Sequence, residues 1–255
     1  MKRFILYILT LFLFFTNTQV FAANFVKKEI KVQSVDKFNI VGTLSYPKLK
    51  GQKEFKTVIL LHSLGYDSFW WENLPQELLE SGYAVLTIDL RGHGKSVYNS
   101  KLIKMSWKDM RPSAYQKMSE DVLAVINFIK EESPKRSFFK NYVIVGADMG
   151  SSVGILVADK MNEKPATIVM LSPVVNVKGL YTPVKMAQLN DTDFLSILGI
   201  NDLTSQKDSK YLKRFAQANY TEYVSKSNST GMMLLKNDED ISKIIVRWIN
   251  QYLNK

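Results

Sequence analysis

Cysteine is absent from the 255 residues of the chain, and histidine occurs only as His62 and His93. Without thiols the protein can form no disulfide framework and can carry no lipid on a leader cysteine. A folded state in an oxidising compartment would therefore depend on the hydrophobic core alone. Imidazole is the side chain that titrates near neutral pH, so its scarcity limits the candidates for a general base.

The sequence also lacks a repeat of fixed period, a low-complexity tract and a linker rich in proline, glycine or serine. With 46% hydrophobic and 23% charged residues, it has the composition of a globular protein. The net charge is +10, but the lysines and arginines are scattered and form no dense run interleaved with aromatics. No nucleic-acid partner is expected from this pattern, whereas weak attraction to anionic envelope polymers stays open.

The first 22 residues have the pattern of a secretory signal peptide. Lys2 and Arg3 precede an apolar run over residues 4–15, and residues 20–22 read V-F-A, with small residues where a signal peptidase needs them. We expect cleavage after Ala22, which leaves one domain at 23–255 that is secreted or periplasmic. The apolar run is short for a membrane helix, so no membrane span is expected after cleavage. An uncleaved anchor is the alternative.

Regular alternation of strands and helices follows the leader. Residues 29–35 and 39–46 alternate polar and apolar side chains, which is typical of antiparallel edge strands. Continuously apolar runs predict strands buried on both faces at 57–61, 83–88, 142–145, 167–171 and 194–198, with a weaker strand at 221–224. Amphipathic patterns predict helices at 70–81, 115–130, 152–161, 207–219 and 241–253. This order implies an α/β fold with a mostly parallel sheet, antiparallel N-terminal strands and helices on both faces.

Five short motifs lie at the ends of these predicted strands. They read H-S-L-G at 62–65, D-L-R-G-H-G-K-S at 89–96, G-A-D-M-G at 146–150, L-S-P at 171–173 and G-I-N-D at 199–202. Their order and spacing resemble those of the α/β-hydrolase superfamily, in particular its compact esterase-like and peptidase-like members. Only about 20 residues separate the fourth motif from the next predicted strand, which is too few for a helical lid. The resemblance thus implies an α/β-hydrolase fold with an open site.

The third motif corresponds to the nucleophile elbow G-x-S-x-G of that superfamily, in which a sharp turn exposes the catalytic serine. In this chain the exposed position is Asp148. Some relatives of the superfamily, the haloalkane dehalogenases and epoxide hydrolases, use an aspartate nucleophile at this position. Both chemistries require a histidine after the last strand. The resemblance makes Leu64 and Met149 the residues whose backbone N–H groups form the oxyanion hole.

That histidine is missing, because both histidines precede the elbow, where the resemblance gives them structural roles. Thr230 aligns best with the family's base, and a threonine hydroxyl cannot accept a proton near neutral pH. Asp202 stands at the position of the orienting acid, although capping of a helix is an equally good interpretation. We expect the N–H groups and the helix dipole to favour the ionised form of Asp148, which would place an anion in the oxyanion hole.

Three hypotheses follow. The first is an exported pseudoenzyme that is retained for binding a small molecule, a peptide or an envelope component, with Asp148, Asp202 and Thr230 as a degenerate triad. The second is a hydrolase that uses Asp148 as nucleophile on an ester, an epoxide or an alkyl halide. The third is an esterase or peptidase that works through other residues. No cofactor is expected, and two carboxylates without a nearby histidine or cysteine give little support for a metal site.

Overall fold

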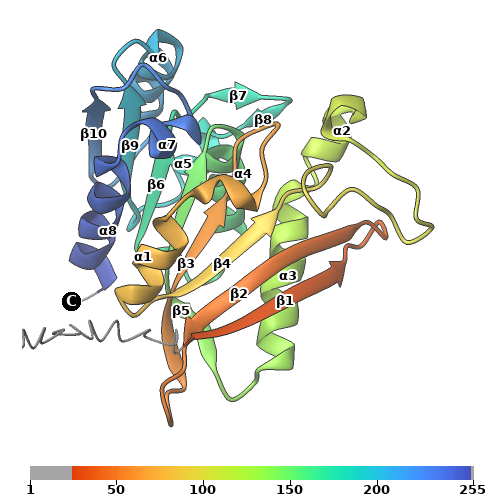
Figure 1. The fold of residues 1–255 in the computed structure, drawn as a ribbon. Coiled ribbons are helices and arrows are strands. Elements are labelled where there is room, and N and C mark those ends of the chain that lie inside the picture. The colour runs from red at the N-terminus through yellow and green to blue at the C-terminus, as the bar shows by residue number, and fades with distance from the viewer. Residues whose placement is uncertain (1–24, 254–255) are drawn as a thin grey trace, which may run out of the picture.

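The computed structural model describes residues 25–253, and its centre is a mixed sheet of eight strands (Figure 1). Their order across the sheet is β1-β2-β4-β3-β5-β6-β9-β10. The strands are β1 (Phe25–Gln33), β2 (Asn39–Pro47), β3 (Glu54–Leu61), β4 (Ala84–Asp89), β5 (Ser137–Ala147), β6 (Thr167–Leu171), β9 (Asp193–Gly199) and β10 (Tyr220–Ser225). Two short strands, β7 (Asn176–Val177) and β8 (Leu180–Tyr181), pair with each other. The leader predicted at 1–22 lies outside the described residues.

The pairing confirms the predicted sheet. Strands β1, β2 and β4 are joined by antiparallel ladders, and every pair from β4 to β10 is parallel. Each of the eight predicted strands is found, although β5 is longer than the apolar run 142–145. The added residues pair with β3 at Ser137 and Asn141, and Phe138 and Phe139 between them are buried in the core, whereas polar Lys140 and Asn141 interrupt the apolar run.

The central strands are buried on both faces, as their uninterrupted apolar runs predict. Successive side chains of a strand point to opposite faces. In β3, Ile59 and Leu61 therefore join one core cluster, while Val58 and Leu60 join the other. All four side chains are fully buried. This arrangement explains why no polar alternation marks these strands in the sequence.

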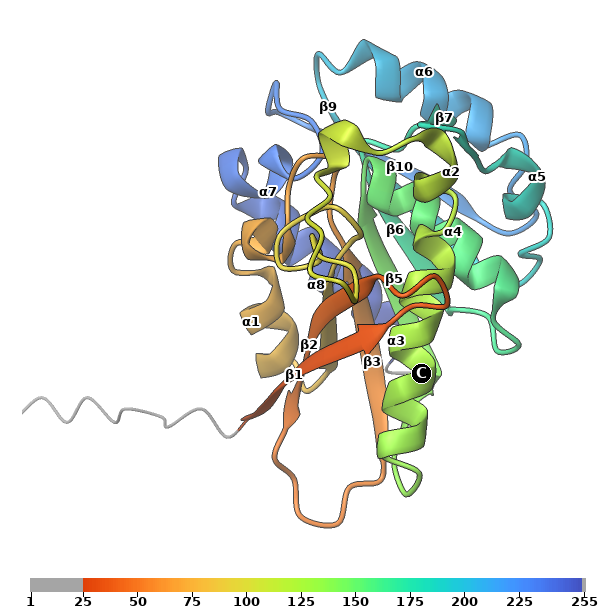
Figure 2. The same cartoon turned by 90° about the vertical axis from the view of Figure 1, so that its right-hand side faces the viewer.

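Helices cover the two faces of the sheet (Figure 2). The helix α3 (Met118–Glu132) and the helix α4 (Met149–Lys160) pack into one core, and α1 (Leu74–Glu80) and α8 (Asp240–Leu253) pack into the other. The remaining helical segments are η1 (Ser68–Trp71), η2 (Trp107–Asp109), α2 (Pro112–Tyr115), α5 (Pro183–Met186), α6 (Leu203–Leu212) and α7 (Met233–Asn237).

Two predicted helices were placed wrongly. The helix predicted at 207–219 is α6, which begins earlier because the side chain of Asp202 caps it. It also ends earlier, because Asn219 already pairs with β9. The carbonyl oxygen of Asn219 accepts a hydrogen bond from the nitrogen of Phe194 at 2.8 Å. The helix predicted at 70–81 is split into η1 and α1, because Glu72 between them takes a φ of 49° that no helix continues.

Only short elements fill the segment between β6 and β9, namely β7, β8 and the four-residue helix α5. They lie against α4 and leave the carboxyl ends of β5, β6 and β9 uncovered by a long helix. Among residues 25–253, no helix combines the length and the apolar character that crossing a membrane requires.

Candidate functional site

The turn between β5 and α4 has the geometry of an elbow. Asp148 has φ 48° and ψ −115°, a backbone conformation that non-glycine residues rarely adopt and that costs on the order of 1 kcal/mol. Gly150 makes the turn possible, because a Cβ there would lie 1.9 Å from the carbonyl oxygen of Leu61 on β3. The turn therefore lifts the Asp148 side chain off the edge of the sheet at the start of α4.

The Asp148 carboxylate lies among backbone donors. The nitrogen of Leu64 is 3.3 Å from its Oδ2 atom, and the N–H group of Met149 also hydrogen-bonds to it. The two residues predicted for the oxyanion hole therefore do contact this side chain. Acyl transfer would need the same N–H groups for the developing oxyanion.

The net pKa shift of Asp148 is opposite to the one that its backbone donors alone would produce. Burial raises the pKa of this carboxyl above its ordinary value, and the charge of Asp202 raises it further. The hydrogen bonds from Met149 and Leu64 lower the pKa, but they do not outweigh the loss of solvation. The donors thus favour the ionised form, as expected, but burial shifts the pKa upward overall, and the sequence does not show how deeply the elbow is buried.

A pocket of about 290 Å³ brings the three predicted site residues together. Asp148 follows β5, Asp202 follows β9 and Thr230 follows β10, so all three come from the carboxyl ends of parallel strands. Its other lining residues are Ser63, Tyr66, Ser172, Val174, Thr204, Ser205 and Gly231. Two carboxylates and several hydroxyl groups thus share one cavity, and no lysine, arginine or histidine lines it.

Asp202 caps α6, as the structural interpretation predicted. Its Oδ1 atom accepts a hydrogen bond from the nitrogen of Ser205 at 3.1 Å. Its Oδ2 atom is enclosed and has no hydrogen-bond partner among the described residues. Leaving such an atom unpaired costs about 1–3 kcal/mol, so this oxygen favours any donor that reaches it.

Thr230 lies exposed on the loop after β10, at the mouth of the pocket. Two serines that the sequence analysis did not assign hold this loop in place. The Oγ atom of Ser172 accepts a hydrogen bond from the nitrogen of Gly231 at 2.9 Å, and the Oγ atom of Ser63 accepts one from Met232 at 3.3 Å. Ser63 belongs to the H-S-L-G motif, which marked this loop in the sequence but not the role of its hydroxyl group.

Both histidines are structural, as predicted. The Nε2 atom of His62 accepts a hydrogen bond from the nitrogen of Leu90 at 2.9 Å, and its Nδ1 atom lies 2.8 Å from the carbonyl oxygen of Ser63. The Nε2 atom of His93 accepts from Gly65 at 3.0 Å. Burial lowers the pKa of both rings, that of His62 to about 4. Each ring therefore stays neutral and joins loop backbones, and neither faces the pocket.

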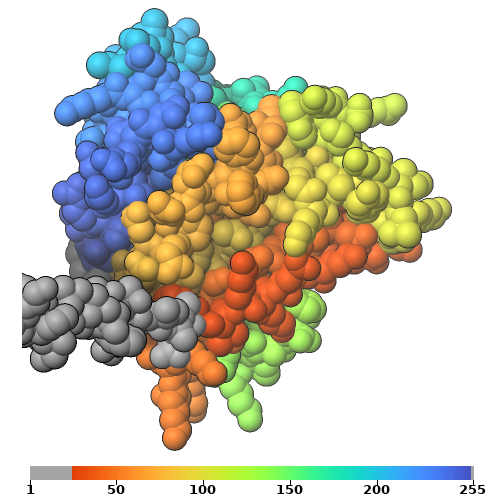
Figure 3. Space-filling model, in the orientation of Figure 1, coloured from red at the N-terminus to blue at the C-terminus, as the bar shows by residue number. Residues whose placement is uncertain are grey.

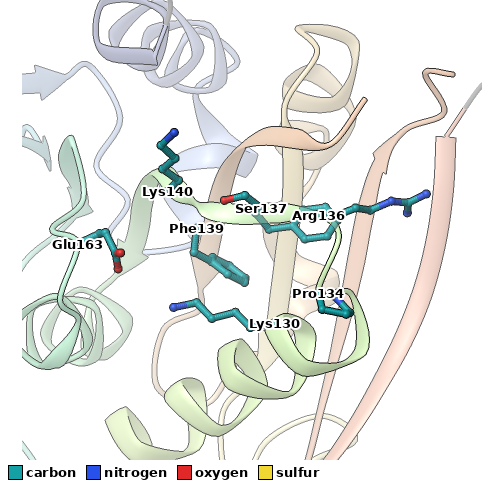
Figure 4. A pocket seen from close by; sticks show the side chains of 8 residues that line it. Lys130, Pro134, Arg136, Ser137, Phe139, Lys140 and Glu163 are labelled. Carbon is teal, nitrogen blue, oxygen red and sulfur yellow. The ribbon is translucent and has the colours of Figure 1, made fainter. Parts of the chain in front are cut away.

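A larger cavity of about 360 Å³ lies at the opposite end of β5. Figure 4 shows Lys130, Lys140 and Glu163 around the ring of Phe139 in this cavity. It contains none of the predicted site residues and only one acid, so it offers neither a nucleophile at an elbow nor a pair of carboxylates. In the described part of the chain, no three acidic or histidine side chains gather in a way that could hold a metal ion.

A family model matches the sequence, and solved structures match the fold. Residues 52–253 match the family model described as serine aminopeptidase, S33. The chain belongs to this family. No curated protein matches the chain.

Solved structures show that this member of the S33 family has an α/β-hydrolase fold. An esterase from Pyrococcus furiosus is 18% identical, with a TM-score of 0.66 over 90% of this chain and 92% of that chain. A carboxyl esterase from Bacillus coagulans is 15% identical, with a TM-score of 0.68 over 89% and 99%. An acylaminoacyl peptidase from Pyrococcus horikoshii is 11% identical, with a TM-score of 0.71 over 91% of this chain and 42% of that chain. Likeness at these identities concerns the fold and not the substrate.

Proposed function

We propose that the chain is an exported ligand-binding protein that has kept the hydrolase fold and lost its turnover. The observation that carries this proposal is the composition of the pocket, in which Asp148 and Thr230 stand where the family resemblance expects serine and histidine. The two histidines of the chain are engaged in buried hydrogen bonds outside it. Without an imidazole beside the elbow, neither a serine-type nor an aspartate-type cycle has its base.

Electrostatics supports the loss of acyl transfer. The Leu64 and Met149 N–H groups already hydrogen-bond to the Asp148 carboxylate. A substrate carbonyl would have to displace this carboxylate and then develop negative charge beside it. Each donor of an empty oxyanion hole raises the rate of acyl transfer on the order of 10²–10³-fold. This rate enhancement is lost while the Asp148 carboxylate occupies the donors.

The same pocket suits a ligand with a positively charged N–H group. A primary ammonium group has three donors and no acceptor. It would match the unpartnered Oδ2 atom of Asp202, the carboxylate of Asp148 and the hydroxyl of Thr230. Its charge would also relieve the repulsion between the two carboxylates, which raises the pKa of Asp148. We therefore infer that the ligand is an amine or a peptide with a free amino group.

Titration by NMR with n-butylammonium and with butyrate as separate probes tests this inference. We expect saturable shifts of pocket resonances with the amine only, and at least about tenfold weaker binding in Asp202→Asn, which removes one charge of the pocket. Asp191→Asn is the matched control, because Asp191 is exposed and precedes β9 at the opposite edge of the sheet. Equal shifts with both probes, or equal binding in both variants, would refute the ligand class.

A second candidate function keeps Asp148 as a nucleophile. The contact of its Oδ2 atom with Leu64 favours this candidate, because one oxygen is held by the N–H group while the other can attack an alkyl carbon. In that step a carbon–oxygen bond forms as the halide leaves, or as the epoxide ring opens and takes up a proton from solvent. Without a histidine to activate water, the resulting ester would persist.

Intact mass spectrometry after incubation with 1-bromobutane or 1,2-epoxybutane distinguishes the two candidates. A stable adduct that maps to Asp148 and is absent from Asp148→Asn would establish a surviving nucleophile. Protein of unchanged mass, together with binding of the ammonium probe, would support the binding function alone.

A further inference from the structure

Two neighbouring turns project from the edge of the molecule and contribute no residue to the lining of the pocket. The turn at residues 34–38 joins β1 to β2, and residues 98–104 belong to the long connection between β4 and α3. We call them the paired turns. Backbone hydrogen bonds tie them together, from Asn39 to the carbonyl of Tyr98 at 2.9 Å and from Ser100 to that of Lys37 at 2.8 Å. Figure 1 shows both at the same end of the sheet, to the right of α3.

The paired turns expose large apolar side chains. Val35 is 95% exposed, Leu102 is 75% exposed and Ile103 is 59% exposed, and Tyr98 beside them is 42% exposed. Single exposed apolar residues are ordinary on a protein surface, but a group on a projecting tip calls for an explanation. Leu102 also has φ 59°, a conformation that L-residues rarely take, so the backbone accepts strain in presenting this tip.

Basic residues surround this apolar tip. Lys37, Lys101 and Lys104 lie on the same two turns, and within residues 25–253 no carboxylate comes within 4.0 Å of their ammonium groups. The one acid of the turns, Asp36, is engaged by Arg91 at 2.6 Å and by Lys117 at 2.9 Å. The paired turns thus carry exposed apolar side chains together with exposed lysines. Figure 3 shows a convex projection where the orange-red and yellow-green surfaces meet.

We propose that the paired turns dock the protein on an anionic lipid bilayer, with Leu102 and Ile103 entering the headgroup region and the lysines facing lipid phosphates. A peripheral contact of this kind combines apolar burial with attraction of lysines to anionic lipid. A convex tip suits a deformable bilayer better than a rigid protein, which would need a matching hollow. The net charge of +10, of which only the two charges of Lys2 and Arg3 lie in the predicted leader, adds long-range attraction to the same surface.

Sedimentation with lipid vesicles tests the docking. The protein, as residues 23–255, is mixed with vesicles of phosphatidylcholine alone or of phosphatidylcholine with an equal part of phosphatidylglycerol. We expect binding to the anionic vesicles only, weakened by high salt. Each lysine near an anionic surface contributes a factor of about five. Lys101→Ala with Lys104→Ala should thus weaken binding at least about tenfold, and Leu102→Ser with Ile103→Ser should do so as well.

The matched control is Val184→Ser with Val224→Ser, since these side chains are 56% and 50% exposed elsewhere. It should bind like the unchanged protein. Absence of sedimentation with anionic vesicles would overturn the proposal. So would a result in which the lysine variant loses binding while Leu102→Ser with Ile103→Ser binds like the unchanged protein. Because the chain has no cysteine, Leu102→Cys can carry an environment-sensitive fluorophore. Its emission should shift to the blue on anionic vesicles, whereas a label at Val184→Cys should not respond, and equal responses would also overturn it.

Discussion

Replacing Asp148 by serine and Thr230 by histidine should restore esterase activity. The φ of 48° at the elbow would present the serine as it now presents the carboxylate. Removing the carboxylate would free the N–H groups of Leu64 and Met149 for a developing oxyanion. The unpartnered Oδ2 atom of Asp202 would be available to accept a hydrogen bond from the new imidazole. The scaffold thus already supplies every part of a triad except the two side chains that are exchanged.

The magnitude follows from what each part contributes. General-base assistance is worth about 10²–10⁴-fold, and triad members act as a unit, so the single variants should gain little. We therefore expect kcat/KM for p-nitrophenyl acetate to be at least about 100-fold higher in Asp148→Ser with Thr230→His than in either single variant. Circular dichroism should confirm that all three variants fold.

A folded double variant without activity would refute this reasoning. It would mean that the loop held by Ser63 and Ser172 places position 230 too far from the elbow for the imidazole to reach the serine. The family resemblance would then explain the fold and not the chemistry.

Three further predictions concern stability. The pKa of His62 falls from 6.5 to about 4 on folding, so the unfolded chain takes up the proton first as the pH falls. Unfolding by urea should therefore show up to about 3 kcal/mol of stability lost between about pH 6.5 and 4, and His62→Gln should remove this part of the pH dependence. Arg91→Met should cost about 3–5 kcal/mol, because it leaves the buried carboxylate of Asp121 without its partner; an unchanged urea midpoint would contradict this. Gly150→Ala should lower the melting temperature sharply or prevent folding, since the added Cβ would overlap the carbonyl of Leu61, and a variant that melts like the original protein would show that the elbow can relax.

The sequence predicted the sheet well because a strand that is buried on both faces consists of an uninterrupted run of apolar residues. The run at 57–61 has no polar alternation, and the structure shows its side chains in two separate cores. Helix ends were harder, because they depend on tertiary contacts. Asp202 starts α6 through its capping bond, and the pairing of Asn219 with β9 shortens it, and neither interaction is visible as periodicity.

The meeting of the three candidate residues was predictable from the sequence, and their electrostatics was not. Strand order alone brings Asp148, Asp202 and Thr230 to one edge of the sheet, so their meeting in one pocket followed from spacing. The raised pKa of Asp148 depends on the depth of that pocket, and the support of the final loop depends on hydroxyl groups from two distant strands. These features arise only when the chain is folded. Whether the three residues have lost catalysis stays a prediction.

The rate of p-nitrophenyl acetate hydrolysis by the purified protein, compared with Asp148→Ala, tests the central claim most directly. If the site binds without turnover, both proteins should hydrolyse the ester at the same low rate, close to that of buffer. A measurable rate that Asp148→Ala abolishes would contradict the account and would establish Asp148 as a working nucleophile.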